Sequence, residues 1–148
     1  MRTAVTTYAR FLAAGVVSCL LSGSPLAATA VRVQLIANPA RAATLTKTEI
    51  RAIYLKRRLL WGDGQPIIPI NREAGSDVRE LFSERIFGQD SRRLAAYWNQ
   101  RYFEAGEFPP ATLASEEAVV RFVAENRNAI GYVTREVDDS VAVLLVVE

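Results

Sequence analysis

Residues 67–82 read IIPINREAGSDVRELF, and this stretch joins a short apolar strand to a helix. The strand is predicted over residues 67–70. Pro69 favours a sheet edge or a strand end, because proline donates no hydrogen bond to a neighbouring strand. Ser76 is a natural N-cap, and Asp77 suits the first turn of the following helix. The apolar positions of that helix share one face: Val78, Leu81, Phe82 and Ile86.

Strands and helices alternate on both sides of this stretch. Further strands are predicted over residues 31–37, 129–134 and 141–147. The last is apolar throughout, so we expect it at the centre of the sheet. No repeat, linker or low-complexity tract interrupts the alternation. The pattern predicts one α/β domain over residues 31–148.

Local signals mark where the predicted helices begin and end. Thr46-Lys47-Thr48-Glu49 is a capping box, and Leu45 and Ile50 have the spacing of a hydrophobic staple. Other helices are expected to begin near Ser91 and Ser115, and Gly88 and Gly106 are expected to end helices. The buried face of the first helix should comprise Ile50, Ile53 and Tyr54. An apolar and aromatic stripe, Leu94, Tyr97, Trp98 and Tyr102, is interpreted as core rather than as a ligand site.

Residues 1–30 have the pattern of a secretory signal peptide. A positive start ends at Arg10, an apolar run covers residues 11–21, and Ala28-Thr29-Ala30 is a small-residue exit. We predict cleavage after Ala30 and a periplasmic or secreted protein. The apolar run is shorter than the roughly 20 residues of a membrane-spanning helix. An alternative is lipoprotein processing at Cys19, which would anchor the protein at a membrane.

Composition excludes several classes of function. The 148-residue chain has 18 Lys and Arg against 16 Asp and Glu, and Arg2 and Arg10 account for the excess. The remaining 118 residues are neutral and lack a basic stripe interleaved with aromatic residues, which argues against nucleic-acid binding. They contain neither Cys nor His, which disfavours disulfides, transition-metal sites and His-assisted nucleophiles. P-loop and dinucleotide fingerprints are absent, so we expect no enzyme activity, no cofactor and no metal.

Three segments together resemble a known family. They are Ile53-Tyr54-Leu55-Lys56 with Trp61, then residues 72–82, then Ala129-Ile130-Gly131-Tyr132-Val133. Their order is similar to that in the phosphate-binding proteins of ABC importers (PstS type). The resemblance implies a single lobe of a type 2 periplasmic-binding-protein fold, with a mixed sheet flanked by helices. Family members are about twice as long and bind an oxyanion between two lobes, and 118 residues suffice for one lobe.

The resemblance implies an oxyanion site at residues 72–79. The family commonly has Arg-Glu-Glu-Gly-Ser-Gly-Thr-Arg here. Arg72, Gly75, Ser76 and Arg79 match this pattern, whereas Ala74, Asp77 and Val78 depart from it. Unpaired N–H groups at a helix start bind anions without a lysine. Val78 lacks the hydroxyl donor, and Asp77 places a carboxylate where it would repel phosphate.

Several alternatives stay open at this point. Ser76 and Asp77 also form an ordinary helix start with no ligand. The chain could then be a periplasmic interaction module that docks on a membrane transporter or receptor, or a homodimer whose two lobes face each other. Lys56-Arg57-Arg58 is interpreted as a solvated helix end, with a docking patch for an acidic partner or lipid headgroups as the alternative, and Trp61 as its potential anchor.

Overall fold

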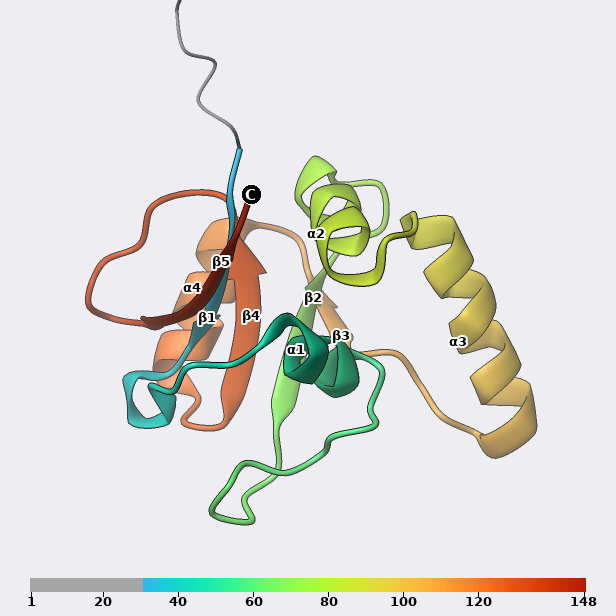
Figure 1. The fold of residues 1–148 in the computed structure, drawn as a ribbon, viewed down its shortest axis with the longest axis horizontal. Coiled ribbons are helices and arrows are strands. Elements are labelled where there is room, and N and C mark those ends of the chain that lie inside the picture. The colour runs from blue at the N-terminus through green and yellow to red at the C-terminus, as the bar shows by residue number, and fades with distance from the viewer. Residues whose placement is uncertain (1–30) are drawn as a thin grey trace, which may run out of the picture.

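A five-stranded mixed sheet forms the centre of the molecule (Figure 1). The computed structural model describes residues 31–148. The strand order is β3-β2-β4-β1-β5. β2 is parallel to β3 and β4, whereas β1 is antiparallel to β4 and β5. The strands are β1 (Val33–Ala37), β2 (Ile68–Arg72), β3 (Ala111–Leu113), β4 (Ala129–Val133) and β5 (Ala142–Val147).

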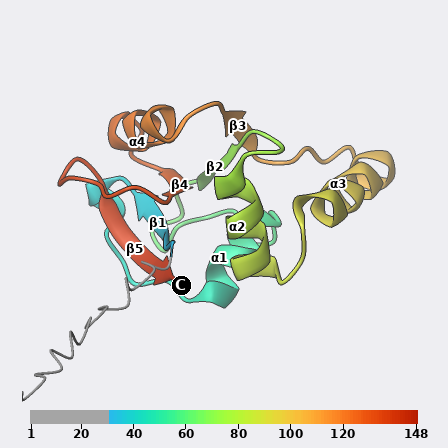
Figure 2. The same cartoon turned by 90° about the horizontal axis from the view of Figure 1, so that it is seen from above.

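Helices cover both faces of this sheet, as expected for an α/β domain. They are α1 (Lys47–Tyr54), α2 (Asp77–Phe87), α3 (Ser91–Ala105) and α4 (Glu116–Glu125), with a 3₁₀ turn at Pro39–Arg41. Seen from above, α4 lies on one side of the sheet and α1 and α2 lie on the other (Figure 2). α3 extends outward beyond α2 and contacts mainly that helix. The predicted α/β class with a mixed sheet between helices is confirmed.

Each face of the sheet has its own hydrophobic core. The core under α1 and α2 contains the largest fully buried side chains, Tyr54, Tyr132 and Phe82. The Phe82 and Tyr132 rings stack with their centroids 3.7 Å apart. The core under α4 is aliphatic, with Val119 and Val123 against the sheet. The aromatic stack places α2 directly over β4, next to the end of β2.

The predicted helix ends are confirmed by their capping contacts. Thr46 accepts a hydrogen bond from the Glu49 N–H, and the Glu49 carboxylate accepts one from the Thr46 N–H. α2 ends at Gly88 and α3 ends at Gly106, both in the left-handed conformation. Each signal involves groups within a few residues of one another, which is why the sequence pattern was sufficient.

The expected central position of the last strand is wrong. β5 is an edge strand, and β1 is its one partner among the strands of residues 31–148. Val143 and Val146 are 43% and 46% exposed. The fully buried strand is β4, in which all five residues are buried. The apolar run reflects the packing of Ala142, Leu144, Leu145 and Val147 on one core, rather than coverage of both faces.

The sequence pattern also misplaced or missed parts of the other strands. β3 was not predicted, because three residues are too few to show a period. β2 begins one residue later than expected and continues to Arg72. It is an inner strand, and Pro69 lies near its start, before the pairing with β3 begins at Ile70. The strand-end interpretation of Pro69 is thus confirmed and the edge interpretation is wrong.

The aromatic stripe of α3 belongs to the core only in its first half. Leu94 and Trp98 are buried, and Tyr97 is half-buried. Tyr102 is 48% exposed, so its assignment to the core is wrong. It contacts the rings of Phe103 and Phe108 at the outer end of the helix, which extends away from the sheet (Figure 2).

Predictions for the N-terminal segment cannot be compared with the structure. The signal peptide, its cleavage after Ala30 and Cys19 all lie outside the described residues. Within residues 31–148, none of the helices is both long and apolar enough to cross a membrane.

Candidate anion site at the start of helix α2

The candidate site lies where β2 ends and α2 begins. The chain leaves the sheet after Arg72 and turns through residues 73–75 into the helix. Gly75 has a φ of 85°, a conformation that favours glycine, and this explains the residue at the turn. The predicted residues 72–79 are therefore brought together at the carboxyl end of β2.

Ser76 caps the helix as predicted. Its Oγ accepts a hydrogen bond from the Arg79 N–H at 3.3 Å and donates one to the Glu73 carbonyl at 3.0 Å. Within residues 31–148, the N–H groups of Asp77 and Val78 have no hydrogen-bond partner. These two amides are the open donors of the helix start.

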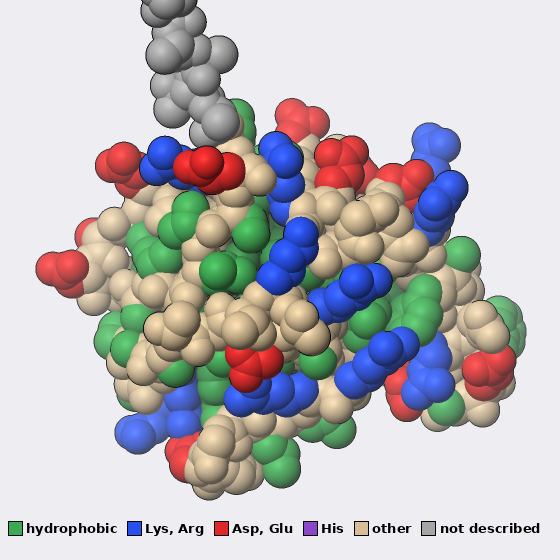
Figure 3. Space-filling model, in the orientation of Figure 1, with side chains coloured by type: hydrophobic (Ala, Val, Ile, Leu, Met, Phe, Trp, Pro, Cys, Tyr) green, Lys and Arg blue, Asp and Glu red, His purple; other side chains and the backbone are tan. Residues whose placement is uncertain are grey.

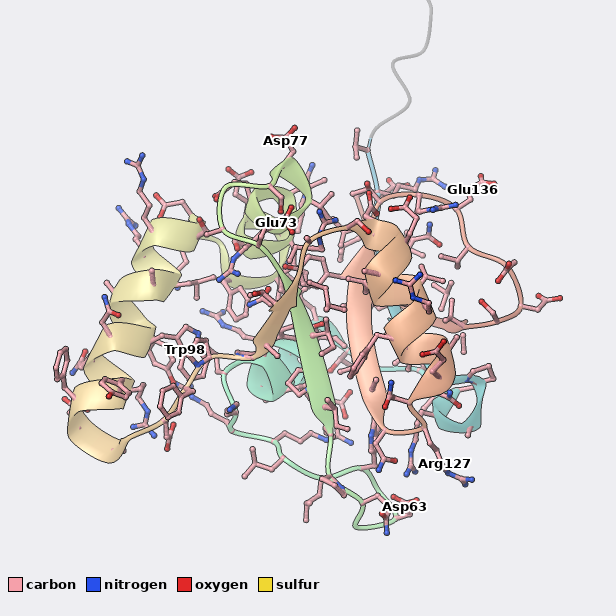
Figure 4. The ribbon with its side chains drawn as sticks, turned by 180° about the vertical axis from the view of Figure 1, so that it is seen from behind. Asp63, Glu73, Asp77, Trp98, Arg127 and Glu136 are labelled. Atoms are coloured by element: carbon pink, nitrogen blue, oxygen red, sulfur yellow. The ribbon has the colours of Figure 1, made fainter. Side chains whose placement is uncertain are left out.

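Asp77 does not close this helix start. Its carboxylate makes no hydrogen bond or ion pair in the described part of the chain, and the side chain is exposed. Figure 4 shows it at the outer tip of α2, directed away from the sheet. The charge of Asp77 therefore remains near the open amides without capping them.

The Arg72 side chain forms its hydrogen bonds within the protein. The side chain is 8% exposed, and Nε and Nη2 form a bidentate pair with the Glu73 carboxylate at 3.1 and 2.9 Å. The same nitrogens donate to the Leu113 and Ala114 carbonyls at 3.2 and 3.1 Å. The hydrogen bonds from Arg72 lower the pKa of the Glu73 carboxyl. Arg72 thus ties the ends of β2 and β3 together, and Glu73 neutralises its charge.

Arg79 is the more available cation of the site. Its Nη1 donates to the Arg72 carbonyl at 2.5 Å. Nε and Nη2 make no hydrogen bond within residues 31–148, and the residue is half-buried. Arg79 lines a narrow cavity between α2 and α3 together with Asn71 and Trp98. Arg79 therefore carries a partly screened positive charge with free donors.

A buried polar network, which no sequence pattern predicted, supports the site. The Tyr132 hydroxyl donates to Asn71 Oδ1 at 2.5 Å and accepts from the Arg72 N–H at 3.1 Å. The Tyr54 hydroxyl donates to the Ile70 carbonyl at 3.0 Å. Burial raises the pKa of both tyrosines well above the ordinary value, so both stay neutral. The network fixes the end of β2, from which the site projects.

Beside the site, Glu80 connects the starts of two helices. Its carboxylate accepts from the Ser91 N–H at 3.2 Å and from the Ser91 hydroxyl. A hollow next to Gly75 is lined by these two residues and by Asp90 and Arg92. Since the Glu80 carboxylate faces this hollow, it adds negative charge near the loop.

Other candidates from the sequence are structural or solvent-exposed. Trp61 is buried, and its Nε1 donates to the Asn128 carbonyl at 3.1 Å, so it cannot anchor a partner. Among residues 31–148 there is no cluster of three or more Cys, His, Asp or Glu side chains able to hold a metal ion.

Comparison with solved structures identifies the fold. No protein-family model and no curated protein matches the chain. An ABC-type phosphate transport receptor from Vibrio cholerae matches with a TM-score of 0.60 and 21% identity, over 76% of this chain and 44% of that one. PstS from Borrelia burgdorferi matches with a TM-score of 0.51 and 16% identity, over 68% of this chain and 39% of that one.

A third matching structure contains bound phosphate. A protein from Clostridium perfringens, assigned as a phosphate ABC transporter substrate-binding protein and solved with bound phosphate, has a TM-score of 0.55 and 28% identity. The match covers 76% of this chain and 43% of that one, so this chain spans less than half the length of these proteins. In structure, this chain is similar to phosphate ABC transporter substrate-binding proteins of the PstS type, and it has the fold of a single lobe.

Proposed function

We propose that this protein binds phosphate or a similar small oxyanion at the start of α2. In this proposal it is an exported solute-binding-type protein, not an enzyme, that is part of or derived from an ABC import system. The observation that carries the proposal is the pair of open amides of Asp77 and Val78, in the same first helical turn as the half-buried Arg79. Amides at a helix start and a nearby guanidinium are donors that suit an oxyanion. The relative solved with bound phosphate supports the choice of ligand.

The charges around the helix start predict weak binding. Arg72 contributes little attraction because Glu73 neutralises it. Asp77 is exposed, so its repulsion of a bound anion is close to the value for water, about 1 kcal/mol at 4 Å. We therefore expect a dissociation constant in the millimolar range, which corresponds to about 4 kcal/mol of binding free energy.

Thermal unfolding with added phosphate, sulfate or arsenate tests the proposal. Ligand at about ten times the dissociation constant should stabilise the protein by about 1.4 kcal/mol, which raises the melting temperature by several degrees. Asp77→Asn should tighten binding about fivefold, because it removes the nearby repulsion. Arg79→Gln should weaken binding.

Glu84→Gln is the matched control for Asp77→Asn. Glu84 is an exposed acid on the same helix, about two turns from the open amides, so the same change of charge should leave the affinity nearly unaltered. The proposal fails if none of the three anions shifts the midpoint of the wild type or of Asp77→Asn.

The internal pairing of Arg72 favours one alternative function. Because this arginine is used within the protein, the scaffold could serve as a ligand-free module that docks on a membrane transporter or receptor. Affinity capture from the cell-envelope fraction tests this alternative, and recovery of no specific partner counts against it. A strictly monomeric mass in solution excludes a site shared between two copies.

A further inference from the structure

The outer surface of α1 and the segment after it concentrate positive charge. Residues 47–58 contain five cations and a single acid, Glu49. Arg58 pairs with Glu49 at 2.7 Å, which leaves Lys47, Arg51, Lys56 and Arg57 in excess. Figure 3 shows Lys and Arg side chains in a band across the face that presents α1. Residues 31–148 are neutral as a whole, so the charge of this surface is balanced elsewhere in the molecule.

Two of these cations occupy positions that the local helix structure disfavours. Lys47 is the first residue of α1, where a positive charge opposes the helix dipole. Lys56 has a φ of 54° and is the single non-glycine residue with positive φ among residues 31–148. It occupies the position after the helix where glycine is favoured, since the Arg57 N–H bonds to the Ala52 carbonyl at 2.8 Å and the Lys56 N–H bonds to the Ile53 carbonyl at 3.0 Å.

Two exposed leucines follow the cations directly. Leu59 and Leu60 are 58% and 53% exposed. Their backbone is held in place, because the Leu59 carbonyl accepts from the Ile67 N–H at 2.8 Å and Leu60 pairs with Pro66. The fold thus holds two large apolar side chains in solvent, next to a cluster of positive charge.

We propose that this basic surface, made of Lys47, Arg51, Lys56, Arg57, Leu59 and Leu60, binds an anionic phospholipid bilayer. The cations are complementary to lipid phosphates, and each cation near such a surface increases binding about fivefold. The two leucines provide the apolar contact that membrane-surface binding also requires. An acidic protein would satisfy the cations, but it would need an apolar patch of its own to cover the leucine pair, whereas a bilayer has acyl chains directly beneath its phosphates. The surface is separate from the start of α2, so this proposal does not depend on oxyanion binding.

Co-flotation with lipid vesicles tests the proposal. Residues 31–148 contain both hydrophobic cores, so this segment is used, and the apolar run of residues 11–21 does not contribute to lipid binding. We expect binding to vesicles that contain phosphatidylglycerol and no binding to phosphatidylcholine alone. Raising the salt from about 0.1 M to about 1 M shortens the screening length from about 10 to about 3 Å and should release the protein.

Paired variants assign the binding to this surface. Lys56→Gly with Arg57→Gln should lower partitioning by about 25-fold, which is about fivefold for each cation. Leu59→Ser with Leu60→Ser should lower it as well. The control is Arg121→Gln with Arg127→Gln, on or next to α4, which covers the other face of the sheet. Both control residues are exposed and form no ion pair within residues 31–148, so their loss should change binding by less than about twofold.

Three results overturn the proposal. One is the absence of binding to phosphatidylglycerol vesicles at low salt. Another is an equal loss of binding in the cation variant and its α4 control, which would mean general attraction. The third is binding of soluble poly-glutamate without binding of vesicles, which would assign the surface to an acidic protein. Vesicle binding that Arg79→Gln leaves unchanged distinguishes this surface from the candidate anion site.

Discussion

Replacement of Gly131 by alanine should destabilise the protein through one close contact between β4 and α4. A Cβ atom at Gly131 would lie 2.5 Å from Val119 Cγ1 and 3.3 Å from Val123 Cγ2. Carbon atoms in good contact are about 3.5–4.0 Å apart, so the first contact is too short by about 1 Å. Val119 is fully buried and β-branched, and such a side chain has one strongly preferred rotamer in a helix. Relief therefore requires a shift of α4.

The expected cost follows from overpacking of a close-packed core. Forcing an extra methyl group into such a site costs about 1–3 kcal/mol. Removing a glycine from the unfolded chain returns about 0.4–1 kcal/mol, so we expect Gly131→Ala to lower the free energy of unfolding by about 1–2 kcal/mol. Urea unfolding, followed by circular dichroism, measures this as a lower midpoint with an unchanged slope.

A double-mutant cycle identifies the contact responsible. Val119→Ala removes the clashing methyl group and leaves a cavity, and the new methyl at residue 131 would fill part of it. The double variant should therefore be more stable than the sum of the two changes predicts, by about 1–3 kcal/mol. Gly62→Ala is the control, because a Cβ there meets no atom within 4 Å. Additive effects, or an equal loss of stability at Gly62, would refute the reasoning.

Two further predictions concern the ends of α1 and β2. Lys56→Gly should raise the free energy of unfolding by about 1 kcal/mol, because glycine adopts the positive φ of this residue without strain, and a lower urea midpoint would contradict this. Glu73→Gln should flatten the acid limb of a plot of stability against pH. The pKa of Glu73 is lowered in the folded protein by Arg72, so its stabilisation is present above the ordinary pKa of 4.5 and is lost as the pH falls through the folded value. Acid unfolding curves of Glu73→Gln and the wild type that coincide would count against this role.

The sequence predicted helix ends better than strand positions. Thr46, Glu49 and Gly88 act on backbone groups within four residues, so their roles follow from local spacing. Strand order depends on contacts between distant segments. The apolar run of β5 is compatible with a central or an edge position, and only its pairing with β1 decides between them.

The candidate site was predictable to a similar extent. Gly75 and Ser76 have the roles expected of a turn and a cap. The internal hydrogen bonds of Arg72 were not predictable, because two of the acceptors, the Leu113 and Ala114 carbonyls, lie more than 40 residues away in the chain. Likewise, nothing local identifies Tyr132 as the partner of Asn71, from which it is separated by 61 residues.

The pairing of β1 with β5 has a consequence for how such a lobe can be connected. Val33 pairs with Val147, and Arg32 forms an ion pair with Glu148 at 3.0 Å. The chain therefore enters β1 and leaves β5 at neighbouring points. Neighbouring strands are only about 4.8 Å apart, so a linker of a few residues could join them in a circular permutant. By the same geometry, the lobe could be inserted as a cassette into a loop of another domain. The inserted lobe and its host domain would then be joined by two adjacent chain segments, which would act as a single hinge. Two domains that close on a ligand require such a hinge.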